Sequence, residues 1–260
     1  MTVNKVKING KVYRGNVTIV NGQVIEGNSS KSGPSKKIDE VKKESSAGIY
    51  AITVNSSVNV KVAKSSTDDI EIHLHGKTLE GNEPNLKLQR FGDELRIFVE
   101  STSETNFSSI NVINGSSISI SNMVTNCSDD LLLEVKLPVK TFKKLHVIST
   151  NGEIEVNKDV KVDILKIDTK NGNIDVSAIF KNLIAETKNG NIDIDSRAVS
   201  DIELSVETKN GNVHASISNI GISNVRVDTQ NGFCRNNPRL KGAYTASGYI
   251  TTKNGNIKFH

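Results

Sequence analysis

A short motif recurs six times in the C-terminal half of this chain, and it restricts the possible folds more than any other feature. The copies read STNGEIEV, TKNGNIDV, TKNGNIDI, TKNGNVHA, TQNGFCRN and TKNGNIKF, and their Asn-Gly pairs lie 20, 18, 21, 21 and 23 residues apart. The paired residues are Asn151, Gly152, Asn171, Gly172, Asn189, Gly190, Asn210, Gly211, Asn231, Gly232, Asn254 and Gly255. A period of this length is typical of stacked repeats, in which each unit buries its apolar face against the next.

The motif is compatible with two kinds of β-structure. Asn-Gly is the preferred two-residue loop of an antiparallel hairpin, in which Thr169 would pair with Ile174. It also suits the corner of a β-solenoid, where equivalent residues form columns and Asn amides hydrogen-bond along the axis. Only stacking explains why Thr and Asn recur in nearly every copy. We therefore predict an all-β fold, a β-solenoid or single-stranded β-helix-like stack of coils of about 20 residues over 48–260, with regular repeats over 145–260.

The residue two positions after each Gly is apolar, and we expect this column to point into the core. The column contains Ile154, Ile174, Ile192, Val213, Cys234 and Ile257. Cys234 is thus expected to be a small buried hydrophobic residue, and it shares no CxxC or metal-ligand spacing with Cys127. Because the last copy, TTKNGNIKFH, is regular, we expect the C-terminal coil to end the stack without a cap and to permit weak self-association.

The first 47 residues differ in composition from the repeats. Residues 1–27 alternate apolar and polar residues around two Asn-Gly pairs and are predicted to form a small β-unit. Residues 28–47 are rich in Ser, Lys, Gly and Pro and are predicted to be a flexible linker. Residues 1–47 carry nine Lys and Arg against four Asp and Glu, whereas the remaining chain carries 24 against 25. The repeats are therefore nearly neutral, which argues against a nucleic-acid partner.

Residues 49–150 show apolar alternation with irregular spacing, which predicts further strands in YAITVNSSVNVKV, DDIEIHLHG, NLKLQRFGDELRIFVE, SSISISNMV and LLLEVKLPV. In EIHLHG, the residues Glu71, His73 and His75 share one side of a strand. Three such groups can hold Zn²⁺ if a fourth ligand comes from elsewhere. Since no motif for that ligand is visible, we interpret them as exposed polar residues and predict no metal.

Two columns of charged residues are expected on the outer surface. Lys170, Lys188, Lys209 and Lys253 form the first, which Gln230 interrupts, and acidic residues stand two positions earlier at Asp168, Glu186, Glu207 and Asp228. These carboxylates offset the repulsion between the stacked lysines. We therefore interpret the face as a solvated surface of mutually neutralised charges, with a polyanion-binding stripe as the alternative. The second column passes from acidic to basic through Glu155, Asp175, Asp193, His214, Arg235 and Lys258. Two interpretations are open: the charge gradient orients a partner or a second copy of the chain, or it reflects sequence drift at an exposed position.

The run LLLEVKLPVKTFKKLHVISTNGEIEV, with a strand that closes on Leu-Pro, a Lys-rich connection and an Asn-Gly corner, resembles the bacterial putative-adhesin family of β-strand-repeat proteins. The resemblance covers about residues 48–260. It implies a β-solenoid-like fold that agrees with the predicted columns, and it implies no catalytic residues.

The sequence lacks the features of an enzyme active site. Solenoid enzymes that act on polysaccharides need clustered carboxylates in a groove, often with aromatic platforms, whereas this chain has no Trp and short connections between repeats. No phosphate loop, nucleophile elbow or cofactor motif is present in the sequence. We predict a non-enzymatic scaffold without cofactors that binds an unknown macromolecule, protein or glycan. With no apolar leader or membrane span in the sequence, a cytoplasmic location is expected, and an exported cell-surface adhesin is the alternative.

Overall fold

The structure is a computed structural model that describes residues 5–8, 11–14, 17–20, 23–26, 35–101 and 131–260. The chain divides into two compact units, Met1–Ser35 and Lys36–His260. In the first unit, β1 (Lys5–Ile8) pairs antiparallel with β2 (Lys11–Arg14), and β3 (Val17–Val20) pairs antiparallel with β4 (Gln23–Glu26). Two predicted segments, residues 28–34 of the linker and the strand SSISISNMV, lie outside the described residues.

The prediction of a flexible linker over residues 28–47 is wrong for its second part. Ser35–Ser45 forms β5, which pairs with β8 (Asp69–Leu79) at the edge of a sheet of the second unit. Lys43 of this strand lies 2.9 Å from Glu71 in an ion pair. Lysine-rich sequences are common in edge strands because they discourage pairing with other chains. The composition of such a strand therefore resembles that of a linker.

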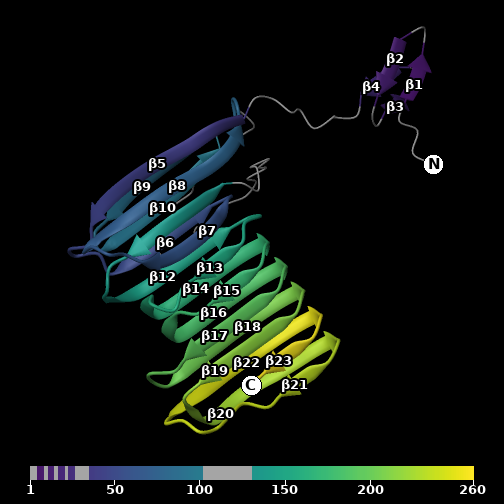
Figure 1. Cartoon of the computed structure of the whole chain (residues 1–260). Coiled ribbons are helices and arrows are strands. Elements are labelled where there is room, and N and C mark those ends of the chain that lie inside the picture. Colours follow the sequence, from purple (N-terminus) through teal and green to yellow (C-terminus); the bar gives the residue numbers. More distant parts are fainter. Residues whose placement is uncertain (1–4, 9–10, 15–16, 21–22, 27–34, 102–130) are drawn as a thin grey trace. The chain divides into compact units, whose positions relative to one another are not determined.

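The second unit consists of two sheets that enclose a common core (Figure 1). Most neighbouring strands are parallel. The exceptions include β9 (Pro84–Phe91), which pairs antiparallel with β10 (Glu94–Ser101), and β8, which pairs antiparallel with β11 (Leu132–Leu137). The nine-stranded sheet has the spatial order β20 (Ile220–Asn231), β22 (Tyr244–Asn254), β18 (Ile202–Asn210), β16 (Ile179–Asn189), β14 (Lys161–Asn171), β12 (Thr141–Ser149), β6 (Ala51–Ser56), β10 (Glu94–Ser101), β9 (Pro84–Phe91). The ten-stranded sheet has the order β21 (Cys234–Asn236), β23 (Ile257–Phe259), β19 (Val213–Ser218), β17 (Ile192–Arg197), β15 (Ile174–Val176), β13 (Ile154–Val156), β7 (Asn59–Lys64), β11 (Leu132–Leu137), β8, β5.

Each repeat supplies one strand to each sheet, and the Asn-Gly corner joins the two strands. Equivalent residues are in register, so that Thr169 pairs with Thr187 in one sheet and Ile174 pairs with Ile192 in the other. Thr169 and Ile174 therefore belong to different sheets, which excludes the antiparallel hairpin. The prediction of an all-β, solenoid-like stack is confirmed.

The predicted inward column is buried at every position but one. Ile154, Ile174, Ile192, Val213 and Ile257 are each at most 1% exposed, and they follow one another across β13, β15, β17, β19 and β23. Cys234 continues the same column but is exposed, so the prediction of a buried cysteine is wrong. Its position at the end of the stack explains the difference, because no further coil covers it.

The coils do not follow one another in chain order at this end. The last repeat, β22 and β23, is inserted between β18 and β19 on one side and β20 and β21 on the other. Ile257 thus pairs with both Val213 and Cys234, and Phe259 is fully buried. The prediction that the C-terminal coil ends the stack is wrong. The reason given for self-association through that coil no longer applies, because its apolar residues are already covered on both sides, and self-association itself stays a prediction.

The coil that does end the stack, residues 220–236, is the least regular copy of the motif. Phe233 is 82% exposed, and Asn236 stands where the neighbouring coil has Phe259. A terminal coil is covered on one side only and tolerates polar residues at inner positions, which is a usual property of capping repeats. The stack therefore has an atypical end coil, and this coil is the second-to-last copy of the motif in the sequence. At the other end of the stack the strands are also out of chain order, because β10 lies between β6 and β9.

Candidate binding surface

The corner asparagines form a continuous ladder along the stack. In the spatial order Asn151, Asn171, Asn189, Asn210, Asn254, Asn231, each side-chain amide after the first donates a hydrogen bond of 2.7–2.8 Å to Oδ1 of the asparagine before it. A second ladder runs beside it, in which the main-chain N–H groups of Asn191, Asn212 and Asn256 donate to Oδ1 of the preceding asparagine at 2.8–2.9 Å. These amides bond one coil to the next, so the corners stabilise the stack rather than present ligand groups.

The corner glycines allow the coils to approach closely. A Cβ atom at Gly190 would lie 2.0 Å from the carbonyl oxygen of Gly172, and the other five corners would show clashes of 1.9–2.2 Å with main-chain oxygen. The threonine before each lysine or glutamine uses the same carbonyls, since Thr208 Oγ1 donates to Gly190 O at 3.0 Å and Thr187 Oγ1 donates to Gly172 O at 3.2 Å. Thr, Asn and Gly thus recur together because all three contact the neighbouring coil.

The lysine column lies on the outer face of the nine-stranded sheet. Lys170, Lys188, Lys209 and Lys253 are exposed and stand on the neighbouring strands β14, β16, β18 and β22. The insertion of the last coil moves Gln230 to the end of this column, so the expectation that it interrupts the lysines is wrong. Among the ion pairs of the described residues, none involves these four side chains. Four free ammonium groups therefore follow one another at strand spacing, about 4.8 Å.

Two shallow hollows of 440 and 570 Å³ follow this column across the sheet. The first lies over β12, β14, β16 and β18, and the second over β18, β22 and β20. They share Glu207 and Lys209 and so form one strip. We call this surface the charged strip; its charged residues are Asp168, Lys170, Glu186, Lys188, Glu207, Lys209, Asp228 and Lys253.

The acidic residues of the charged strip differ in their partners from coil to coil. His146 Nε2 lies 2.6 Å from Asp168 Oδ2 and Lys166 Nζ lies 3.4 Å away. Burial alone would raise the pKa of Asp168, but these two partners hold it below its usual value. Next in the column come Glu186 and Glu207, which take part in no ion pair that the described residues make. The centre of the strip thus offers unpaired carboxylates and unpaired ammonium groups side by side.

The second predicted column lies on the outer face of the ten-stranded sheet. In space the column runs Glu155, Asp175, Asp193, His214, Lys258, Arg235. It therefore still passes from acidic to basic residues, although the last two coils are not in chain order. Lys61 extends it at the acidic end with an ion pair of 2.9 Å to Glu155. Partial burial, together with the carboxylates of Asp193 and Glu155, raises the pKa of Asp175.

Removal of the charge at Asp175 is expected to stabilise the protein. An Asp175→Asn variant should melt about 1–4 °C higher than the parent near pH 7, because like charges directly opposite each other destabilise paired strands. A raised pKa in the folded state means that the cost is present above this pKa and disappears as pH falls below the usual value of 3.8. The gain should therefore vanish near pH 3. Melting curves from circular dichroism at both pH values, with the turn variant Asp159→Asn as control, test this, and an equal gain at both pH values would contradict it.

Cys234 has no environment that would activate a nucleophile. Although Cys234 is exposed, partial desolvation by its neighbours and the carboxylate of Asp228 raise the pKa of its thiol, which keeps it protonated.

The histidine strand forms a different cluster from the one that the sequence suggested. Glu71 is held by Lys43, whereas Glu134 of β11 lies near His73 and His75. Sequence reasoning missed Glu134 because nothing in the sequence shows that β11 pairs with β8. The described part of the chain contains no helix with the length and apolar character needed to cross a membrane.

Parallel coils in two sheets, joined by corner ladders of Thr, Asn and Gly, define a β-solenoid-like repeat protein. The chain belongs to the Toastrack DUF4097 family, whose sequence model matches residues 49–260. This agrees with the predicted resemblance to a putative-adhesin family of β-repeat proteins. No curated protein matches the chain.

Several solved structures are similar to this chain at low identity. A putative cell adhesion protein from Clostridium sporogenes is 13% identical, with 86% of this chain and 99% of that one covered and a TM-score of 0.49. A putative adhesin from Bacteroides fragilis is 13% identical, with 86% and 98% covered and a TM-score of 0.44. A putative lipid binding protein from Parabacteroides distasonis is 13% identical, with 85% and 96% covered and a TM-score of 0.36.

Proposed function

We propose that this chain is a non-catalytic scaffold that binds another macromolecule along the charged strip. The observation that carries the proposal is the uninterrupted row of four lysines, free of ion pairs within the described residues, beside the free carboxylates of Glu186 and Glu207. A surface with regular donors and acceptors at strand spacing favours an extended partner with complementary groups. Because carboxylates accompany the lysines, the strip favours mixed polar groups over a simple polyanion.

The strip can be tested by reversing two charges at its centre. We expect the full-length Lys188→Glu, Lys209→Glu variant to capture its partners from native cells at least about tenfold less than the parent, because repulsion and lost contacts act together. The matched control is Lys158→Glu, Lys241→Glu, which makes the same change in net charge at exposed positions outside the strip. All three proteins should melt within about 2 °C of one another, since the replaced side chains are exposed. Equal capture by the strip variant and the parent would refute the assignment.

A glycan-binding, adhesin-like role is the second candidate, and one observation favours it. Tyr249 is 42% exposed on β22, and the same outward face of that strand carries Thr251 and Lys253 in the strip. An exposed aromatic ring beside hydroxyl and ammonium groups suits a sugar ring with its hydroxyls. If this role holds, Tyr249→Phe should keep glycan binding on an array and Tyr249→Ala should lose it. Protease treatment of intact cells separates the two locations, because a surface adhesin must be cleaved from outside, whereas a cytoplasmic scaffold is protected until lysis.

A further inference from the structure

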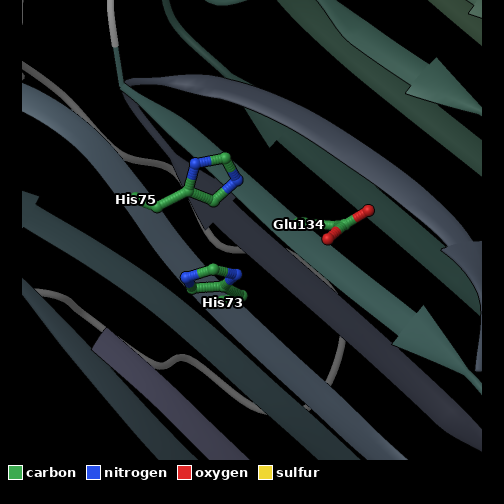
Figure 2. Close-up of side chains that lie close together, drawn as sticks. All are labelled: His73, His75 and Glu134. Atoms are coloured by element: carbon green, nitrogen blue, oxygen red, sulfur yellow. The ribbon is translucent and has the colours of Figure 1, made fainter. Parts of the chain in front are cut away.

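Two histidines and a glutamate meet on the outer face of the ten-stranded sheet. His73 and His75 share one face of β8 because they are two residues apart, and the intervening Leu74 is fully buried. β11 runs antiparallel beside β8, and its Glu134 stands directly opposite His73. Figure 2 shows the two imidazole rings one above the other, with the carboxylate of Glu134 beside them. The cluster therefore depends on a strand pair whose members are about sixty residues apart in the chain.

The three side chains offer nitrogen and oxygen donors at close range. One donor atom from each lies within 4.8 Å of the other two, and all three residues are half-buried. The imidazole centroids of His73 and His75 are 4.4 Å apart with the rings inclined by 37°.

A fourth residue holds His73 in a suitable orientation. Asp39, on the edge strand β5, lies 2.8 Å from Nε2 of His73. This hydrogen bond leaves Nδ1 of His73 as the atom that can donate its lone pair to a cation. A carboxylate that orients a histidine through its other nitrogen is a usual partner of metal-binding histidines. Glu71, the acid that the strand itself offers, is instead engaged by Lys43 at 2.9 Å.

We propose that His73, His75 and Glu134 bind a divalent transition-metal ion, with Zn²⁺ as its representative. Two imidazoles and one carboxylate suit Zn²⁺, Ni²⁺ and Cu²⁺ better than Mg²⁺ or Ca²⁺, which prefer oxygen donors alone. Bonds of about 2.1 Å to a tetrahedral ion place donor atoms about 3.4 Å apart, so donors that lie within 4.8 Å of one another close by up to about 1.4 Å on binding. Glu134 exchanges its ion pair with Lys136, at 3.2 Å, for the metal. Three protein donors leave one position for water or for a group of a partner.

Calorimetric titration of the untagged, metal-free full chain with ZnCl₂ tests the site. We expect one ion per chain, a loss of this binding in His73→Ala and in His75→Ala, and at least about tenfold weaker binding in Glu134→Gln. Asp39→Asn should weaken binding by about 10- to 100-fold, because it removes only the residue that orients His73. Zn²⁺ should also raise the melting temperature of the parent and not that of His75→Ala, since a ligand of the folded state alone stabilises it.

The variant His214→Ala is the matched control. His214 and His260 form the other histidine pair of the described chain, with stacked rings 4.8 Å apart. Asp193 lies 3.6 Å from Nδ1 of His214, but no carboxylate or thiol of the described residues is grouped with both rings. This variant should bind Zn²⁺ like the parent. Circular dichroism verifies that every variant is folded. The assignment is overturned if the parent binds no Zn²⁺ at about 0.1 mM, if the three ligand variants bind as tightly as the parent, or if His214→Ala removes the binding.

Discussion

Replacement of Gly190 by alanine should lower the melting temperature by about 6–12 °C. The added Cβ would lie 2.0 Å from the carbonyl oxygen of Gly172, and main-chain atoms of two hydrogen-bonded coils cannot move apart without loss of the ladder between them. Overpacking of this kind costs about 3 kcal/mol at the upper end of the usual range, and each kcal/mol shifts the melting temperature of a domain of this size by about 2–4 °C.

Thermal unfolding followed by circular dichroism measures this effect, with Lys188→Ala as the control. Lys188 is on the same strand, is exposed and has no ion pair among the described residues, so its truncation should change stability by no more than about 0.5 kcal/mol. If the two variants melt at the same temperature, the coils are not in the close contact that the structure shows.

A charge in the inward column should have an equally large effect. Ile192 is fully buried between Ile174 and Val213, and an aspartate at this position would have no partner for its carboxylate. An unpaired charge in such a site costs several kcal/mol, of the order of the whole stability of a domain. We therefore expect Ile192→Asp to unfold the protein or to disrupt the coils adjacent to residue 192, because each coil is stabilised mainly by its neighbours.

Hydrogen exchange distinguishes these two outcomes, since disruption of part of the stack would remove amide protection first from the coil of residue 192, β16 and β17, and from its neighbours β14, β15, β18 and β19. Ile192→Val is the control, because it removes one methyl group from the same site and should cost only about 0.5–1.5 kcal/mol. A melting curve for Ile192→Asp that matches the control would show that the side chain is not in the core.

The Asn-Gly repeat and its apolar positions were sufficient to predict the stack and its inward column. Stacking places equivalent residues at equal depth, so that a column of Ile at one offset from the corner must be either buried or exposed as a whole. The same argument predicted the asparagine ladder and the two charge columns. The prediction for Cys234 was wrong because this residue lies at the end of the column. It is in register with the buried residues of the other coils, but no further coil covers it.

The linker prediction failed for a related reason. β5 has only two apolar residues, Ile38 and Val41, among its lysines and acids, and composition alone does not show whether such a segment has a sheet edge to join. The proposed metal site depends on the same kind of information. His73 and His75 are adjacent on one strand, but Glu134 and Asp39 reach them only because β11 and β5 lie on either side of β8.

The sequence by itself determined the period of the stack, the composition of each column and the polar corners, because these follow from residues within a single repeat. Only the tertiary structure decided the order of the coils. A strand pairs with whichever edge gives it the most buried surface, and that edge need not belong to the preceding repeat. Insertion of the last coil buries Ile257 and Phe259 on both sides and leaves the more polar coil of residues 220–236 at the end. The same exchange places Lys253 beside Lys209, which makes the row of lysines continuous.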